Sequence, residues 1–548
     1  MATAPPRLGD LLSQQNLITP EQLDFTLREQ KATGELMGEC LIRLGMITDT
    51  DLALVLSEQV NKPFVDLRKF LPDPKLLALV PPKVATHYEF LILSKDGNEL
   101  HIAIGDPFNQ KAAEQVYRIT GLIVKVHIAA SGLLQKMIDR FYYLIEYPIE
   151  DEIRQITDKL RQNPTMEVDV QQLVHNLLGS AVSYRVTDIH ITPSDKSCRI
   201  MFRIDGVIKP NYVFPISLHS RITTNVKVQS GMDIAEQRKP QDGRMSFDFF
   251  GESFDIRVSS MRTRFGENIV MRLLPSRGGS TLGLRELGFS KEIQARLHRI
   301  FKLPYGMILV AGPTGSGKTT TLYAALREQD AISKNILTVE DPIEYELLMI
   351  RQTQVNTRAG YTFASAIRTF LRQDPDVMLI GEIRDEETAG LAVRAALTGH
   401  LVLSTLHSNT AIAALARLKD LGISPYLLST SLKGILAQRL IRRLCEHCKE
   451  ETTLTPEQLE ENKLPADATY FKAGRCAHCQ QTGYLGRDAI SELVPVTDLI
   501  MRLIAQDASP DKIEDACIKE GFSSLRDAGR SKVISGATSL DELIRVLG

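Results

Sequence analysis

The chain has 548 residues, of which 43% are hydrophobic and 24% charged, and this length predicts three or four domains. It carries 65 basic and 67 acidic side chains, so the formal net charge is −2 and no global positive field favours nucleic acid or anionic lipid. No apolar run reaches the roughly 18 residues that span a bilayer, and MATAPPRLGDLL lacks the features of a signal peptide, so we expect a cytoplasmic protein.

The first sixty residues contain a repeat. RLGDLLSQQNLITPEQLDFTLREQ aligns with LMGECLIRLGMITDTDLALVLSEQ at an offset of 29 residues, so that Gly9 matches Gly38 and Thr19 matches Thr48. Each unit has the pattern of a short amphipathic helix, a turn, a Thr cap before acidic residues and a second helix. The repeat predicts a small helical module over residues 1–60.

The remaining chain changes character several times. We predict a module at 1–145 (the helical repeat, then α/β structure over 61–145), a charged linker at 146–165, a second α/β domain at 166–288, an ATPase-type core at 289–444, a four-cysteine insertion at 445–490 and a helical region at 491–548. In the core, MILVAG, NILTVE, DVMLIG and LVLSTL are nearly continuous apolar strands, which is typical of a parallel sheet covered by helices.

A phosphate-binding loop follows the first of these strands. The residues that match G-x-x-x-x-G-K-[ST] are Gly312, Pro313, Thr314, Gly315, Ser316, Gly317, Lys318 and Thr319, and Thr320 continues into a predicted helix. The backbone N–H groups of such a loop point at phosphate oxygens, the lysine bridges the β- and γ-phosphates, and the Thr hydroxyl binds Mg²⁺. A Gly-rich turn matched by chance is the alternative, and the flanking strand and helix disfavour it.

Polar residues end the other core strands. Glu382 follows DVMLIG, His407 follows LVLSTL, and Glu340, Asp341 and Glu344 follow NILTV. Parallel sheets bind ligands at the carboxyl edge, so we expect Glu382 to hold Mg²⁺ through water and one of the other acids to polarise the attacking water. His407 is a candidate sensor of the γ-phosphate.

These segments together resemble a family of secretion ATPases. GPTGSGKTTTLYA, ILTVEDPIEYE, GEIRDEETA and TGHLVLSTLHSN are similar to the motifs of the ATPases of type II secretion and type IV pilus assembly. The resemblance implies a RecA-like core with Glu344 as catalytic base, Glu382 as the Walker B acid, and His400 and His407 in the histidine box.

The preceding domain carries the same resemblance. RVTDIH, RIDG, GMDIAEQRKPQDGR and DIRVSS resemble the second N-terminal (PAS-like) domain of this family, whose arginines reach the phosphates. By position, Arg257 and Arg272 are the best candidates for that role. Ordinary surface ion pairs are the alternative.

Four of the seven cysteines form two C-x-x-C pairs, Cys445 with Cys448 and Cys476 with Cys479. Two such knuckles can hold one tetrahedral ion, and thiolates favour Zn²⁺, so we predict structural zinc. An iron–sulfur cluster or a redox pair is the rival interpretation.

The N-terminal repeat also resembles a second-messenger module of some pilus and secretion ATPases. The resemblance implies that cyclic di-GMP binds to Arg7, Leu8, Gly9, Leu11 and Leu12. Asn16 departs from the glycine that is typical of the turn, and Met37 and Cys40 replace residues of leucine type. A helical docking module that binds no nucleotide is the alternative.

The resemblance as a whole implies a homo-hexameric ATPase that uses ATP and Mg²⁺ to power assembly of a type IV pilus or a type II secretion pseudopilus. Its expected partner is an inner-membrane platform protein, which would keep it cytoplasmic and peripheral at that membrane, with no nucleic acid bound. The alternatives are a pilus retraction motor, disfavoured by the long N-terminal region and four cysteines, and a DNA-translocating RecA-like motor, disfavoured by near-neutral charge.

Overall fold

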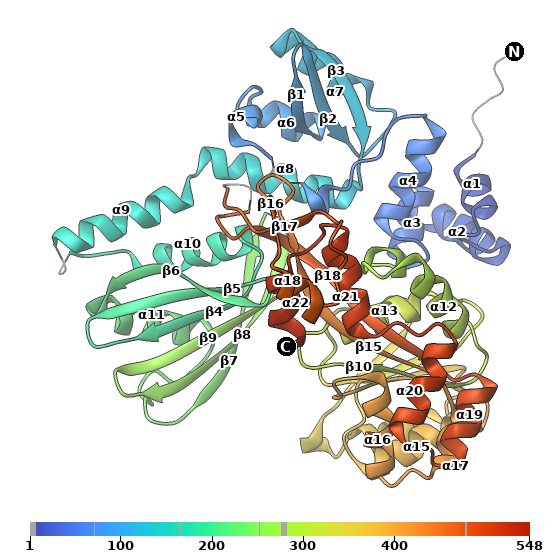
Figure 1. Ribbon diagram of the computed structural model, residues 1–548. Helices are drawn as coiled ribbons and strands as arrows, with labels where there is room; N and C mark the ends of the chain where they lie inside the picture. The colour runs from blue at the N-terminus through green and yellow to red at the C-terminus, as the bar shows by residue number, and fades with distance from the viewer. Residues whose placement is uncertain (1–6, 71, 164–165, 251, 276–281, 477–478) are drawn as a thin grey trace, which may run out of the picture. The chain divides into compact units, whose positions relative to one another are not determined.

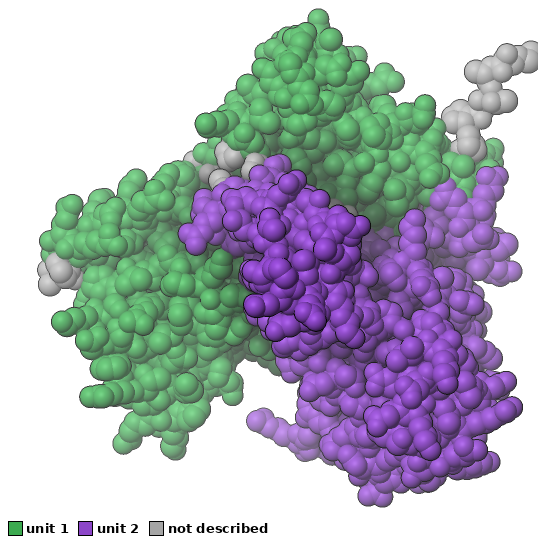
Figure 2. Space-filling model, in the orientation of Figure 1, with its two compact units in different colours: residues 1–12, 49–280 green, residues 13–48, 281–548 purple. Residues whose placement is uncertain are grey.

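The computed structural model describes residues 7–70, 72–163, 166–250, 252–275, 282–476 and 479–548. The chain forms two compact units, one of residues 1–12 and 49–280 and the other of residues 13–48 and 281–548 (Figures 1 and 2). Within the ranges described, no helix combines the length and the apolar character that a bilayer crossing requires.

The repeat forms the helices that its pattern predicts. They are α1 (Leu8–Gln14), α2 (Pro20–Thr33), α3 (Met37–Arg43) and α4 (Asp49–Gln59). Thr19 caps α2 in a reciprocal pair with Gln22, in which each side chain accepts a hydrogen bond from the other residue's backbone N–H. Asn16 and Gly45, which match in the repeat, both have left-handed backbone, with φ of 55° and 75°. Asparagine therefore fills the turn that glycine fills in the second unit.

A three-stranded sheet follows in the order β1-β2-β3 (Phe90–Asp96, Glu99–Ile104, Ile123–Ile128). β1 and β2 are the strands that the sequence predicts, and they pair antiparallel. β3 lies parallel to β2, and α7 (Gln110–Thr120) makes the crossover between them. Helices α5 (Pro74–Leu77), α6 (Pro82–Tyr88) and α8 (Ser131–Glu146) complete this small α/β layer.

The predicted linker is wrong for most of its length. Residues 149–162 form helix α9 (Ile149–Gln162), and Ile149, Ile153 and Leu160 are buried in the core of the next domain. The Asn176 side chain of α10 (Val170–Ser183) donates to Glu152 at 2.9 Å. The apolar residues of α9 form a stripe at helical spacing, although charged residues outnumber them in its sequence.

The next domain has a six-stranded antiparallel sheet in the order β6-β5-β4-β9-β8-β7. The strands are β4 (Val186–Pro193), β5 (Ser197–Ile204), β6 (Val207–Pro215), β7 (Gln241–Phe249), β8 (Glu252–Thr263) and β9 (Gly266–Pro275). Burial alternates along β7, β8 and β9, as expected of strands with one core face. Side chains from that face join those of α10 and α11 (Ile216–Gln229) in one core, which leaves the other face for polar residues.

The second unit contains a seven-stranded sheet in the order β12-β11-β13-β14-β10-β15-β18, parallel except for β18. The strands are β10 (Gly306–Ala311), β11 (Ile336–Glu340), β12 (Arg351–Gln354), β13 (Val377–Ile380), β14 (Leu401–Leu406), β15 (Leu432–Leu444) and β18 (Tyr484–Pro495). Every residue of β10, β11, β13 and β14 is buried, which confirms the predicted parallel core.

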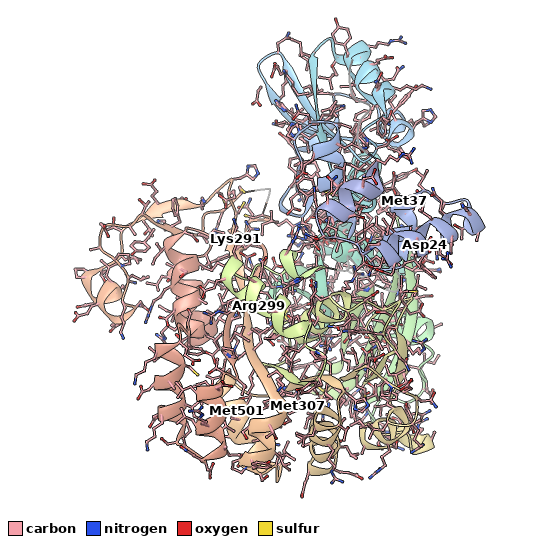
Figure 3. All side chains as sticks on the ribbon, turned by 90° about the vertical axis from the view of Figure 1, so that its right-hand side faces the viewer. Asp24, Met37, Lys291, Arg299, Met307 and Met501 are labelled. Carbon is pink, nitrogen blue, oxygen red and sulfur yellow. The ribbon has the colours of Figure 1, made fainter. Side chains whose placement is uncertain are left out.

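Helices cover both faces of this sheet. Met307, Leu309 and Ala311 of β10 join one buried cluster, whereas Ile308 and Val310 join another (Met307 is labelled in Figure 3). The first cluster contains α14 (Phe363–Phe370), α15 (Glu386–Leu397), α16 (Ala411–Asp420), α17 (Pro425–Ser431), α19 (Asp498–Ala505) and α20 (Pro510–Lys519). The second contains α12 (Lys291–Phe301) and α13 (Lys318–Arg327).

Strands β15 and β18 form a long antiparallel pair that extends beyond the central sheet. Between them lie β16 (Glu450–Thr452), α18 (Pro456–Glu461) and β17 (Tyr470–Lys472), and after them come α21 (Leu525–Ile534) and α22 (Leu540–Leu547). The fully buried carboxylate of Glu542 on α22 accepts hydrogen bonds from Arg442 of β15 and from Arg545. This pairing ties the C-terminal helix to the strand that leads to the cysteines.

Candidate nucleotide site and cysteine cluster

The phosphate-binding loop lies between buried β10 and the first turn of α13. Its ends, Gly312 and Ser316, are buried, whereas residues 313–315 are exposed. Gly312, Gly315 and Gly317 have φ of 154°, 78° and 86°, which L-residues rarely adopt. A Cβ on Gly312 would lie 2.8 Å from the carbonyl oxygen of Gln438, so glycine also makes room for the adjacent strand.

Lys318 opens α13, and its ammonium group turns back over the loop. Nζ donates to the carbonyl oxygens of Gly312 at 2.9 Å and Pro313 at 3.0 Å. Burial lowers the pKa of Lys318, the negative charge of Glu382 opposes this, and the positive charge of Arg439 adds to it. The lysine and the predicted Walker B acid therefore share one electrostatic environment.

Glu382 lies just beyond β13, among three basic groups. Its carboxylate pairs with Arg384 at 2.5 Å and lies 3.5 Å from Nε2 of His407, which follows β14. The Glu382 side chain is only 12% exposed. The structure thus brings Lys318, Glu382 and His407 together at the carboxyl edge of the sheet, as the sequence predicts.

Glu340 does not fit the role of a catalytic base. Its buried carboxylate accepts hydrogen bonds from Tyr323, from Thr338 at 2.6 Å and from Gln352 at 3.1 Å. Burial, and then the charge of Glu340, raises the pKa of Tyr323, so the phenol remains a donor. With three donors already on its buried carboxylate, Glu340 anchors the loop and leaves Asp341 and Glu344 as the candidates.

Glu344 is exposed on the loop after β11. Its backbone N–H donates to the Tyr323 hydroxyl at 3.4 Å, so the network around Glu340 also holds this loop. The role of Glu344 as base stays a prediction.

His400 lies away from this edge. It precedes β14, whereas His407 follows it, so a six-residue strand of about 20 Å separates them. Nδ1 of His400 lies 2.9 Å from the Ala395 carbonyl oxygen, at the end of α15. The two histidines of the predicted box therefore do not meet within one chain.

Two residues of β15 contact the site, and sequence reasoning missed both. The Gln438 side chain, 1% exposed, donates to the Ser316 carbonyl at 2.7 Å. Arg439 donates to the Asn409 side chain at 3.1 Å, on the loop that follows His407. No sequence motif predicts their role, because the sequence does not show that β15 lies beside β10.

Arginines form a row across the six-stranded sheet, on the face opposite its core. Arg244, Arg257 and Arg272 are direct cross-strand neighbours on β7, β8 and β9. They line a cavity of about 460 Å³. Adjacent like charges repel, so such a row favours a bound anion. Sequence reasoning selected Arg257 and Arg272 but missed Arg244, because strand register was not available.

One buried carboxylate ends the row. Asp188 of β4 lies opposite Arg272, and its Oδ1 accepts from Arg272 Nε at 2.8 Å. Arg203 on the other neighbouring strand lies 3.4 Å from the second oxygen. Arg257 has no comparable partner among the described residues, since its Nε lies 4.0 Å from Asp255 and makes no hydrogen bond.

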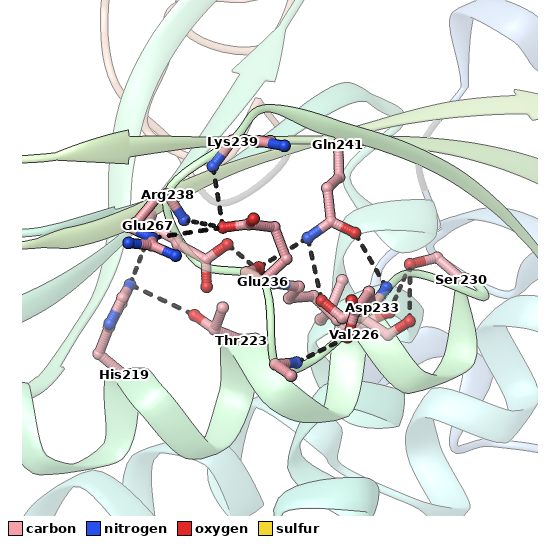
Figure 4. Close-up of polar contacts among 12 residues, drawn as sticks. His219, Thr223, Val226, Ser230, Asp233, Glu236, Arg238, Lys239, Gln241 and Glu267 are labelled. Atoms are coloured by element: carbon pink, nitrogen blue, oxygen red, sulfur yellow. Dashed lines mark hydrogen bonds and ion pairs between the residues drawn. The ribbon is translucent and has the colours of Figure 1, made fainter.

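The loop that precedes β7, and so leads to Arg244, is held by hydrogen bonds among its own residues. Glu236 accepts from the backbone N–H groups of Arg238 and Lys239, and Gln241 donates to the carbonyl oxygens of Asp233 and Glu236 (Figure 4). Beneath it, the buried Lys227 of α11 donates to the Glu236 carbonyl at 2.7 Å and to Glu267 at 3.0 Å. This network explains why QRKPQDGR forms a fixed turn despite its polar composition.

The four cysteines of the two knuckles converge. Their sulfur atoms all lie within 4.8 Å of one another, and Cys445–Cys476, Cys448–Cys479 and Cys476–Cys479 are separated by 3.8, 3.6 and 3.7 Å. A tetrahedral Zn–S₄ site with bonds of about 2.3 Å has an edge of about 3.8 Å, so the thiols fit zinc. Burial raises the pKa of the Cys445 thiol to about 11, which means that it remains protonated unless a cation displaces the proton.

The predicted second-messenger residues lie at the start of the chain. Gly9 and Leu12 of α1 are buried, Leu8 and Leu11 are half-buried, and Arg7, before the helix, is exposed. In the second repeat unit the position of Arg7 is taken by Leu36, which is 69% exposed. The two units therefore offer different side chains to a ligand.

Comparisons with known proteins agree with this geometry. The family model for type II/IV secretion system proteins matches residues 164–545, and that for the MshEN domain matches residues 60–146. The type IV pilus assembly ATPase PilB of Myxococcus xanthus is 39% identical over 557 aligned residues, 98% of each chain. The type II secretion system ATPase E of Vibrio cholerae is 45% identical over 403 residues, 72% of this chain and 80% of its own.

A solved structure supports the fold alone. The Legionella pneumophila ATPase DotB, at 19% identity, has a TM-score of 0.52 and covers 70% of this chain and 97% of its own. Since one family model matches well over half of the chain and a curated relative matches it throughout, the chain belongs to the type II/IV secretion system protein family and is an ATPase.

Proposed function

We propose that this chain forms a homo-hexamer that hydrolyses ATP at the cytoplasmic face of the inner membrane and powers type IV pilus assembly through a membrane platform protein. The proposal that the chain hydrolyses ATP rests on the convergence of Lys318, Glu382 and His407 at one edge of the sheet. Relatives named for pilus assembly align over 92–98% of the chain, whereas those named for type II secretion align over 69–74%, which favours the pilus over the pseudopilus.

We propose a role for each group at the nucleotide site. Backbone N–H groups of residues 312–319 and the ammonium of Lys318 bind the phosphates, and α13 presents its N-terminus to them. Thr319 and Glu382 would hold Mg²⁺, which supplies charge neutralisation between the phosphates. Glu344 would take the proton of the attacking water, and His407, beside Glu382, would respond to the γ-phosphate.

The arginine row supplies the remaining positive charge. Arg244, Arg257 and Arg272 have a single buried carboxylate at one end of the row, so they retain charge that phosphate oxygens can neutralise. Arginines on one domain and a phosphate loop on another make hydrolysis depend on domain closure, within a chain or between subunits. Closure on ATP and release after hydrolysis would generate the motion that drives the platform protein.

Asp188→Asn tests the arginine row. The change removes the charge that holds Arg272 Nε while keeping the side-chain shape, so we expect kcat for ATP to fall about 10- to 100-fold. KM should change little, because the phosphate loop is untouched. Steady-state kinetics and a melting curve are the measurements, with the exposed Asp195→Asn of the same domain as control. An unchanged kcat in a folded Asp188→Asn protein would show that catalysis does not need Asp188 to hold Arg272.

The partner assignment needs a separate test. The full chain is purified with and without candidate inner-membrane proteins, and phosphate release is measured in each case. We expect a hexamer by light scattering and faster turnover with the platform protein. Stimulation by DNA instead of the platform protein would indicate a nucleic-acid motor, and loss of pilus retraction in a deletion strain that still assembles pili would indicate a retraction motor.

For the N-terminal module we propose cyclic di-GMP as ligand. Support comes from the repeat itself, whose matching turns at Asn16 and Gly45 share left-handed backbone, and from the residues of α1 that match the second-messenger pattern. Arg7 would stack on or bond to a guanine.

Arg7→Ala tests this ligand. Calorimetric titration of the full chain with cyclic di-GMP should give a dissociation constant at least about tenfold higher than for the unmodified chain, because one charged contact is lost. Arg28→Ala, on an exposed face of α2, is the control and should bind normally. Absence of heat for the unmodified chain at high micromolar ligand would leave the module as a docking element.

A further inference from the structure

We infer that Gln438 is a positioning residue of the nucleotide site, which sets the orientation of the peptide bond between Ser316 and Gly317. The side chain comes from β15, far from the loop in sequence, and is 1% exposed. Its amide nitrogen donates to the Ser316 carbonyl at 2.7 Å, and its amide oxygen accepts from the Thr321 hydroxyl of α13 at 2.8 Å. Both ends of the amide are therefore in use, and the Ser316 carbonyl, which can only accept, is the group that decides which way the amide points.

The consequence follows from peptide geometry. In a trans peptide the C=O and N–H groups point in opposite directions. Because Gln438 holds the Ser316 oxygen toward β15, the N–H of Gly317 points away from that strand, which leaves it available to the phosphates that loops of this type bind. If the peptide turned over, a carbonyl oxygen would face the phosphates in place of a donor.

Glycine makes such a rotation of the peptide accessible, so another residue has to hold the peptide in place. Gly317 has no side chain to restrict its backbone, and its φ of 86° lies in a region that glycine leaves easily. Gln438 also fills the space beside Gly317, since a Cβ on Gly317 would lie 3.2 Å from Gln438 Nε2. Whether the loop offers a donor or an acceptor to a phosphate therefore depends on Gln438 of β15, which lies outside the sequence motif.

The inference rests on the nucleotide site proposed above, and a binding assay without turnover separates the two. We would titrate inorganic tripolyphosphate into the full chain with Mg²⁺. Gln438→Met keeps the size and neutrality of the side chain but removes both hydrogen bonds, and we expect binding to weaken about 10- to 100-fold. In hydrolysis assays, KM for ATP should rise more than kcat falls.

Thr321→Val is the matched control, because it removes the second hydrogen bond of the same amide and leaves the donor to Ser316. We expect it to bind tripolyphosphate within about twofold of the unmodified chain. Should Gln438→Met melt at a markedly lower temperature, Gln438→Leu is measured in its place, since it is also neutral and also removes the donor to Ser316.

Each outcome decides. Weak binding by the Gln438 variants with normal binding by Thr321→Val supports the inference. Equal weakening in both, or no weakening in either, overturns it and leaves Gln438 as a packing residue. If the unmodified chain binds no tripolyphosphate, the proposed nucleotide site itself fails.

Discussion

Lys318→Ala is expected to lower ATP turnover by about 100- to 1,000-fold while the protein stays folded. The ammonium group is a preorganised charge at the place where negative charge develops during phosphoryl transfer, and loss of one such group has effects of this size. Folding should not suffer, because the hydrogen bonds that Lys318 makes go to the carbonyl oxygens of Gly312 and Pro313, at the loop where water can replace them.

The measurement is phosphate release by the full chain with Mg²⁺, together with a thermal melt. Lys302→Ala is the matched control, since Lys302 is exposed just after α12 on the same domain. Turnover that falls less than tenfold in Lys318→Ala would contradict the proposed site. A large fall in Lys302→Ala as well would show that general charge, and not the loop, controls the rate.

The parts of the fold that sequence predicts well are those whose signals are local. Apolar runs such as 306–311 and 401–406 are buried strands because six consecutive apolar or small residues have no polar face to expose. The Thr19 cap and the Asn16 turn depend only on residues within a few positions. The same holds for the phosphate loop, whose glycines and lysine all lie within residues 312–318.

What sequence reasoning missed depends on contacts between distant segments. Gln438 reaches the phosphate loop only because β15 lies beside β10, and Arg244 joins Arg257 only because of the register between β7 and β8. The sequence of helix α9 predicts a linker because its charged residues outnumber the few apolar ones, and only the domain that buries those apolar residues shows their role. In each case tertiary structure supplied information that no local pattern contains.

Replacing Cys445 and Cys448 together by serine should abolish zinc binding and unfold the segment between β15 and β18. The thiols fit a tetrahedral ion, and binding of structural zinc is worth on the order of 10 kcal/mol to a small domain. Gly474 shows how closely the knuckles approach, because a Cβ there would lie 1.8 Å from the Cys448 carbonyl oxygen. Without the ion, the two knuckles lose the group that joins their four thiols.

The effect should be confined to that segment. β15 and β18 remain paired from Gly434–Pro495 to Leu444–Tyr484, and Glu542 still holds Arg442, so the parallel sheet keeps its edge. We therefore expect loss of about one zinc per chain by elemental analysis and new proteolytic cleavage within residues 445–483, with the ATPase core still resistant. Cys517→Ala, a buried cysteine on α20, is the control and should retain the metal. Iron in the purified protein would favour a cluster instead, and full protease resistance of a metal-free double variant would mean that the two knuckles need no ion.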